Sequence, residues 1–305
     1  MAIVPTDVPM TSQLALQTME ALTRRYPFLR SELLATTAFG RPIRSLSIGD
    51  GPRNVLYAAS FHANEWITTP LLLQFAEDYA EAVATGGTVA GQDAAELFEF
   101  ATIHMVPMVN PDGVDLVTGV LGQEGEEYQR ALTLARNYPN IPFPEGWKAN
   151  LLGTDLNLNW PAGWLQAREI KFSQGYTRPG PRDYVGRFPL DQIEAQALYD
   201  YTYRIDPALV LAWHSQGQVI YWQYADIEVP GARELAERFA ALSGYALEDV
   251  PFNSSFAGYK DWFIQTFRRP GFTIEVGEGT NPLPLSQFPE IYAATLPILV
   301  SAALG

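Results

Sequence analysis

Apolar and polar residues follow two different periods along the chain, one typical of strands and one typical of helices. Short apolar runs bounded by turn residues predict buried strands, and they lie at 54–60, 100–109, 208–213, 219–224 and 271–276. Apolar residues at helical spacing predict helices at 11–25, 66–84, 191–204, 231–242, 258–267 and 289–304. A looser alternation over 33–48 predicts a β-hairpin. Strands and helices that alternate in this order predict one α/β domain.

Residues 114–190 do not follow this pattern. They contain many Pro, Gly and aromatic residues and little periodicity, and an unstructured loop of that length is unusual inside a compact domain. We therefore expect these residues to form packed, partly helical segments that line one side of a functional site. At the start of the chain, residues 1–10 include Pro5 and Pro9 and are predicted to be an extended segment. The folded domain, which holds every candidate site residue discussed below, is then expected to cover residues 11–305.

The composition narrows the possible functions. The chain has a formal net charge of −14, which argues against nucleic acid or an anionic membrane surface as a partner. It has no cysteine, so disulfides, thiolate zinc sites and cysteine nucleophiles are excluded. No uninterrupted apolar stretch is long enough to predict a transmembrane helix. The N-terminus lacks the features of a signal peptide, so a cytoplasmic location is expected; the oligomeric state stays open.

Two histidines and one glutamate are the candidate metal ligands. His62 and Glu65 lie in the predicted turn after the strand 54–60, and α/β folds gather their chemistry where strands end. Two neutral imidazoles and one carboxylate form a common catalytic zinc set. His214 also follows a predicted strand directly, whereas His104 lies inside one and is predicted to be structural. We therefore expect His62, Glu65 and His214 to bind one metal ion.

Other polar residues are candidates for the remaining chemistry. Glu275 ends an apolar strand, where a carboxylate is either desolvated and suited to base catalysis or held in an ion pair. The sequence leaves open whether Arg268 or Arg269 forms that pair. Lys148 lies upstream of the segment 153–160 and could stabilise an oxyanion, although most lysines are simply solvated.

The segment 153–160 alternates polar and apolar residues. Such an alternation is typical of an extended strand, and it predicts that Asp155, Asn157 and Asn159 point the same way. Polar side chains on one face suit a substrate wall or a second layer around metal ligands. The segment Asn110–Gly113 predicts a turn.

Taken together, these motifs resemble the zinc carboxypeptidases of the carboxypeptidase A type. They are, in order, His62-Ala-Asn-Glu65, Asn110-Pro-Asp-Gly113, Gly153-Thr-Asp-Leu-Asn157, His214-Ser215 and Thr273-Ile-Glu275. The resemblance implies a single α/β domain with a mixed, mostly parallel central sheet flanked by helices. It implies one Zn²⁺ per chain on His62, Glu65 and His214, with Glu275 activating the bound water. Lys148 stands where the family places an oxyanion-stabilising arginine.

The departures from the family pattern concern the substrate. Family carboxypeptidases follow the asparagine at 157 with an arginine that grips the terminal carboxylate, and here Leu158 cannot make that contact. Asn64 replaces an arginine often found before the metal-binding glutamate. Phe252 or Asn253 stands where the family has a tyrosine over the S1′ pocket. The residues expected to contact substrate are Asn64, Asn157, Leu158, Ser215, Phe252 and Arg182.

These departures are similar to one subgroup, the γ-D-glutamyl-meso-diaminopimelate peptidases of bacterial cell-wall peptides. The similar phrases lie at 62–69, 106–117, 142–150 and 255–265. The resemblance implies hydrolysis of small murein peptides, rich in carboxylates, so a cation must replace the missing arginine. Candidate cations are Arg168, Lys171, Arg178, Arg182 and Arg187. Alternative functions are an ordinary zinc carboxypeptidase, an N-acyl amino acid deacylase and, last, a wall-peptide binder without activity.

Overall fold

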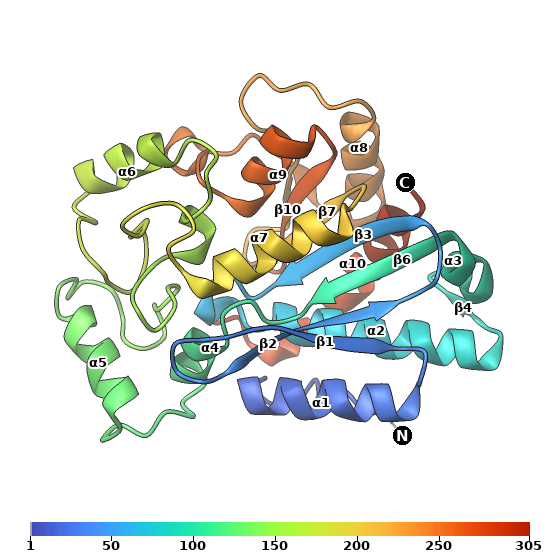
Figure 1. Cartoon of the computed structure of the whole chain (residues 1–305), viewed down its shortest axis with the longest axis horizontal. Helices are drawn as coiled ribbons and strands as arrows, with labels where there is room; N and C mark the ends of the chain where they lie inside the picture. Colours follow the sequence, from blue (N-terminus) through green and yellow to red (C-terminus); the bar gives the residue numbers. More distant parts are fainter. Residues whose placement is uncertain (1) are drawn as a thin grey trace.

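A mixed eight-stranded sheet runs through the centre of the computed structural model, which describes residues 2–305 (Figure 1). Its strand order is β1 (Arg30–Thr36), β2 (Pro42–Ile48), β6 (Ala101–Val106), β3 (Arg53–Ala59), β7 (Val210–His214), β10 (Gly271–Glu275), β8 (Val219–Tyr221) and β9 (Ala246–Leu247). The four central strands, β6, β3, β7 and β10, are parallel to one another. On one side β2 and β1 follow in antiparallel order, and on the other β8 is antiparallel to β10 while β9 is parallel to β8. The predicted single domain with a mixed, mostly parallel sheet is confirmed.

Each face of the sheet contributes to a separate apolar core, because side chains alternate between the faces along a strand. On β3, Tyr57 and Ala59 pack into the larger core, whereas Leu56 and Ala58 pack into the smaller one. The larger core includes side chains of α1 (Ser12–Arg25), α2 (Thr68–Thr85), α8 (Ala232–Ser243) and α10 (Phe288–Leu304). The smaller core includes side chains of α7 (Ile193–Ile205) and α9 (Tyr259–Phe267), which cover the opposite face (Figure 1).

Most predicted elements are found, and the differences lie at their ends. The predicted hairpin is β1 paired antiparallel with β2, and the Thr11 hydroxyl caps α1 by accepting from the Leu14 amide. The apolar run beginning at residue 100 was predicted to be all strand, but α3 (Ala94–Phe100) precedes β6. The predicted loop after α2 contains a two-stranded hairpin of β4 (Thr88–Val89) and β5 (Gln92–Asp93). Asn110 does not make a simple turn, because its side chain caps α4 (Pro111–Val117).

The irregular region after α4 is packed and partly helical, as its aromatic content predicts. It contains α5 (Glu126–Ala135), the 3₁₀ turn η2 (Leu156–Leu158) and α6 (Trp164–Ser173). Trp147 is fully buried with Ala131 and Ala149, and Trp164 packs with Leu158 in a second small cluster. Figure 1 shows this region, in green and yellow-green, standing beside one end of the sheet. We call residues 118–192 the loop wall.

The C-terminal helix α10 is apolar on most of its surface. Together with the 3₁₀ turn η4 (Leu285–Gln287), it is long and apolar enough to cross a membrane by length and composition alone. In the structure it packs against α2, α8 and the sheet, and Ile298, Leu299 and Ala302 are fully buried. Its apolar character is therefore explained by its place in the core.

Candidate active site

The predicted metal ligands and Glu275 lie together at the C-terminal ends of the central parallel strands, which we call the strand-end edge. His62 follows β3, His214 is the last residue of β7, and Glu275 is the last residue of β10. The strands are parallel and in register, so that Glu275 pairs with His214 and Ala59 pairs with Trp213. Parallel strands end on the same side of a sheet, which is where ligands bind in open α/β folds. The predicted convergence of the two histidines follows from this register, which also places Glu275 beside His214.

The His62 turn is held in place by the Asn110 motif. The Asn110 side chain donates to the carbonyls of Phe61 (3.1 Å) and Ala149 (3.0 Å), and the Ala63 amide donates to the Lys148 carbonyl at 2.9 Å. Gly113 lies so close that an added Cβ would be 2.6 Å from the Ala149 carbonyl oxygen. Only glycine fits there, so the motif clamps the metal turn to the segment that carries Lys148.

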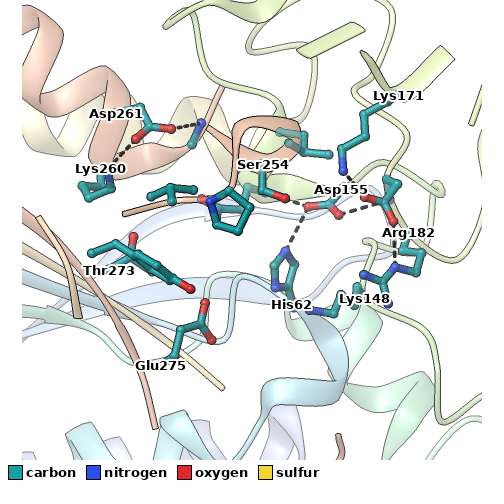
Figure 2. A pocket seen from close by; sticks show the side chains of 17 residues that line it. His62, Lys148, Asp155, Lys171, Arg182, Ser254, Lys260, Asp261, Thr273 and Glu275 are labelled. Carbon is teal, nitrogen blue, oxygen red and sulfur yellow. Dashed lines mark hydrogen bonds and ion pairs between the residues drawn. The ribbon is translucent and has the colours of Figure 1, made fainter. Parts of the chain in front are cut away.

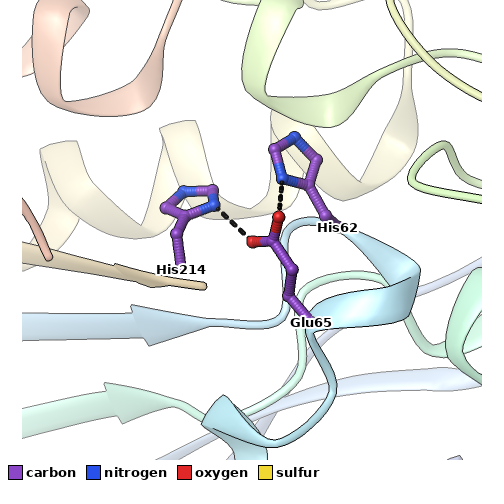
Figure 3. Close-up of side chains that lie close together, drawn as sticks. All are labelled: His62, Glu65 and His214. Carbon is purple, nitrogen blue, oxygen red and sulfur yellow. Dashed lines mark hydrogen bonds and ion pairs between the residues drawn. The ribbon is translucent and has the colours of Figure 1, made fainter. Parts of the chain in front are cut away.

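His62, Glu65 and His214 converge around one point (Figure 3). The Nδ1 atoms of both histidines lie 2.9 Å from Glu65 carboxylate oxygens, Oε1 for His62 and Oε2 for His214. One candidate ligand atom from each residue lies within 4.8 Å of the others. The three side chains are buried, and Glu65 belongs to the short turn η1 (Ala63–Glu65). The donor set of two imidazoles and one carboxylate fits a catalytic zinc ion.

The electrostatics around the three residues favour a cation. Burial would raise the pKa of Glu65, but the charges of His62 and Lys148 hold it well below its usual range. Burial lowers the pKa of His62, but the negative charges of Glu65 and Asp155 outweigh the effect of burial. The pKa of His62 is therefore raised to about 9. Burial also lowers the pKa of His214. A proton on His62 therefore occupies a place that a metal ion can take, with release of that proton.

Asp155 orients the first histidine. Its Oδ1 lies 3.0 Å from His62 Nε2, and its Oδ2 accepts from the Asp183 amide at 3.1 Å. A carboxylate on Nε2 fixes the proton there and leaves Nδ1 to face the metal position. The predicted common direction of Asp155, Asn157 and Asn159 is wrong for Asn159, because η2 turns the chain: the first two line the cavity and Asn159 does not. Asn157 accepts from the Tyr259 amide (3.2 Å), whereas Asn159 donates to the Val185 carbonyl (2.9 Å).

Glu275 and Lys148 flank the three candidate ligands. Glu275 forms no hydrogen bond or ion pair within residues 2–305, and Arg269, one proposed partner, pairs with Asp206 at 2.7 Å instead. Burial, then the negative charge of Glu65, raises the pKa of Glu275 to about 8. Lys148 Nζ donates to Glu65 Oε1 at 2.7 Å, and its pKa is raised by nearby carboxylates despite burial. Both side chains line the same cavity.

The cavity above this edge is walled by loops on both sides (Figure 2). Among the residues predicted to act on substrate, those that line it are Lys148, Glu275, Asn157, Leu158 and Arg182. Three others do not line it. The Asn64 side chain donates to the Glu145 carbonyl, and the Ser215 hydroxyl donates to Asn281. Phe252 is 71% exposed on the turn η3 (Phe252–Ser254) and packs edge-on against Phe256.

Several charged residues of the cavity were not singled out by the sequence. They are Asp183, Lys260 and Asp261. Lys260 and Asp261 lie in the first turn of α9. Helical periodicity alone could not indicate which face of this helix meets the cavity, and the only signal in the sequence was the similarity of residues 255–265 to the γ-D-glutamyl-diaminopimelate peptidases. Of the five candidate cations, Lys171 and Arg182 line the cavity. His104 is structural, since its ring lies 2.8 Å from the Tyr201 hydroxyl and 3.2 Å from Asn54.

Comparisons with known proteins agree with this geometry. The family model for zinc carboxypeptidases matches residues 15–297. The gamma-D-glutamyl-L-diamino acid endopeptidase 1 of Lysinibacillus sphaericus is 44% identical over 93% of this chain and 69% of its own length. The uncharacterized protein YqgT of Bacillus subtilis (strain 168) is 39% identical over 90% of this chain and 72% of its own.

Solved structures share the fold at low sequence identity. Thrombin-activatable fibrinolysis inhibitor matches with a TM-score of 0.77 and 17% identity, over 100% of this chain and 76% of its own. Murein-tripeptide amidase MpaA from Escherichia coli O157 matches with a TM-score of 0.55 and 20% identity, over 89% and 91%. The family match spans all the motifs that meet at the strand ends. This chain therefore belongs to the zinc carboxypeptidase family of metallopeptidases.

Proposed function

We propose that this enzyme hydrolyses the amide bond between the γ-carboxyl group of D-glutamate and a diamino acid such as meso-diaminopimelate in bacterial cell-wall peptides. The observation that carries the proposal is Leu158, which lines the cavity where an ordinary carboxypeptidase needs an arginine. A chain 44% identical over most of this sequence bears the name of a γ-D-glutamyl-diamino acid endopeptidase. The lysines and arginine in the cavity suit a substrate with several carboxylates.

His62, Glu65 and His214 are the residues that would hold zinc. When bound, the ion supplies Lewis-acid polarisation of the scissile carbonyl and lowers the pKa of a water molecule. Asp155 keeps the proton of His62 on Nε2, so that Nδ1 is free to bind. We infer one ion for each chain, because within residues 2–305 this is the one cluster of three such side chains with converging ligand atoms.

Glu275 and Lys148 are the proposed acid–base and electrostatic groups. Glu275 accepts a proton from the water that attacks the carbonyl carbon, and it passes that proton to the leaving nitrogen as the C–N bond breaks. Burial raises the pKa of Glu275 above that of an exposed carboxyl group, which makes its carboxylate a stronger base. Lys148 uses one of its three N–H donors on Glu65, which leaves others for the oxygen that becomes negative during the attack.

The test is hydrolysis of L-Ala-γ-D-Glu-meso-diaminopimelate, followed by mass spectrometry, with a hippuryl-amino acid in parallel. We expect release of free diaminopimelate, and we expect a zinc chelator to abolish it. Cleavage of the hippuryl substrate alone would identify an ordinary carboxypeptidase and remove the significance given to Leu158. Activity only on N-acyl amino acids would identify a deacylase on the same scaffold. Binding of the tripeptide without cleavage of any substrate would favour a wall-peptide binder.

A further inference from the structure

We propose that Arg182 is the residue that recognises the γ-linkage, by binding the free α-carboxylate of the D-glutamyl residue on the acyl side of the scissile bond. This inference rests on the proposed function and assigns Arg182 to the opposite side of the substrate from the diaminopimelate carboxylate. In a γ-linked glutamyl residue the α-carboxylate stays free and lies a short aliphatic chain away from the scissile carbonyl. An α-linked residue has no carboxylate in that position.

The direction of the substrate follows from β10. Thr273 and Glu275 are two residues apart on this strand, so their side chains lie on the same face, and both line the cavity. Because Glu275 delivers the proton to the leaving nitrogen, the amine side of the substrate extends along this face. Figure 2 shows Thr273 and Lys260 on one side of His62, and Lys148 and Arg182 on the other. The acyl side therefore lies toward Lys148 and Arg182.

Arg182 has unused donors in that part of the cavity. Its Nε donates to Asp183 Oδ2 at 2.7 Å, and within residues 2–305 its two terminal nitrogens make no hydrogen bond. The other oxygen of Asp183 accepts from Lys171 Nζ at 2.6 Å. Among these three side chains two cations share one carboxylate, which leaves a net positive charge on the group; the nearby Asp155, whose charge also acts on Arg182, is paired with His62. The side chain is 41% exposed, and its planar guanidinium group matches a carboxylate in geometry.

The opposite end of the cavity is electrically balanced. Lys260 Nζ donates to Asp261 at 2.6 Å and also to the Gln223 carbonyl, so a lysine there faces its own carboxylate. A balanced pair suits a leaving diamino acid, which carries charges of both signs. The unbalanced positive group lies only on the acyl side. This difference between the two ends is what assigns Arg182 to the glutamyl carboxylate.

A short chain of contacts fixes Arg182 relative to the reaction centre. The Asp183 amide donates to Asp155 Oδ2, and Asp155 Oδ1 holds His62. The residue next to Arg182 is thereby tied to a candidate metal ligand through one carboxylate. Because Arg182 is held at a fixed distance from the reaction centre, the enzyme can select substrates whose carboxylate lies at the matching distance from the scissile bond. Lys171 acts as a positioning residue, because it holds the Asp183 side chain that orients Arg182.

The experiment compares two substrates that differ in one group, L-Ala-γ-D-Glu-meso-diaminopimelate and the same peptide with its glutamyl α-carboxylate converted to an amide. For the wild-type zinc enzyme we expect kcat/KM to be roughly tenfold to hundredfold higher on the acid, the range for a hydrogen-bonded ion pair. Arg182→Met should lose at least tenfold more on the acid than on the amide. Arg182→Lys should recover part of the preference, and Arg178→Met, an exposed arginine outside the cavity, should keep it.

Binding to the zinc-loaded Glu275→Gln variant provides a second readout that needs no turnover. Calorimetry should give a lower Kd for the acid than for the amide, and adding Arg182→Met should remove most of the difference. Equal cleavage of both substrates by the wild type would overturn this inference and leave the proposed function standing. Cleavage of neither substrate would instead overturn the proposed function. An equal loss on both substrates in Arg182→Met would mean that Arg182 serves the reaction centre or the fold.

Discussion

The strand-end edge and the loop wall build two halves of the same cavity by different means. The edge places His62, His214 and Glu275 through backbone pairing, because β3, β7 and β10 are adjacent parallel strands. The loop wall places Asp155 and Arg182 through side-chain contacts between short segments with little regular structure. Backbone register thus places the strand-end residues, and side-chain contacts place the residues of the loop wall that line the rest of the cavity. The same edge can therefore serve different substrates when the wall changes.

We expect the largest loss of activity from a substitution at the strand-end edge that removes an acid–base group and keeps the size of the side chain. Glu275→Gln keeps the size of the side chain but cannot take a proton, so we expect kcat to fall by roughly 10²–10⁴. Bound zinc, measured by elemental analysis, should stay at the wild-type level, because Glu275 is not among the converging ligands. Glu278→Gln, at an exposed position three residues later, is the matched control. A variant that lost zinc would give Glu275 a role in metal binding instead.

Much of the edge could be predicted from the sequence because its geometry follows from periodicity. Apolar runs predict strands, and parallel strands bring their ends together. His62 and His214 were therefore predicted to meet, although they are 152 positions apart in the sequence. Glu275 was less certain, since an ion pair was equally consistent with its position. The structure speaks against the ion pair, because Arg269 pairs with Asp206 and Glu275 lies beside His214 in register; the role as base stays a proposal.

The loop wall and the segment 250–261 on the other side of the cavity could not be predicted at the same level. The alternation around Asp155 indicates a strand, yet the chain forms a 3₁₀ turn there, because Asp155 accepts from the Asn157 amide and starts the turn. Lys260 is on a correctly predicted helix, but the face that meets the cavity depends on how α9 packs on the sheet. Phe252 was predicted by alignment with a family position, and its loop turns it to solvent. Such features depend on tertiary contacts, which local patterns do not contain.

Asp155 tests where the two halves depend on each other, because it belongs to the loop wall but holds a residue of the edge. Asp155→Asn keeps the shape and removes the charge that fixes the His62 proton on Nε2. We expect zinc affinity to fall by roughly 10–100-fold, measured by competition with a chelator. Asp191→Asn removes another carboxylate of the wall, one that contacts Arg187 and Asn159 but no metal ligand. If both variants bind zinc equally well, the edge is independent of the wall.

The smallest effect on the reaction is expected where the loop wall rests on α7. Glu194 lies buried in the first turn of that helix. Its Oε1 accepts from Asn150 at 3.2 Å, and its Oε2 has no hydrogen-bond partner among residues 2–305. Burial, together with the nearby charges of Asp112 and Asp191, raises the pKa of Glu194 to about 7. The folded protein therefore binds a proton at this site that the unfolded chain releases at lower pH.

The sign of the pH dependence follows from that difference. Between the unfolded pKa, which the model value places at 4.5, and the folded pKa of about 7, the native state binds more protons, so stability falls as pH rises. The loss from this residue is about 2 kcal/mol between about pH 5 and about pH 7. In Glu194→Gln, whose amide stays neutral, urea unfolding should show a stability curve flatter by that amount. Glu169→Gln, which removes a carboxylate from an exposed position on α6, should keep the wild-type slope.

Two identical slopes in Glu194→Gln and wild type would mean that Glu194 is already ionised in the folded protein. The loop wall would then contact α7 through an ionised carboxylate, and not through the neutral carboxyl group that a pKa of about 7 favours at lower pH.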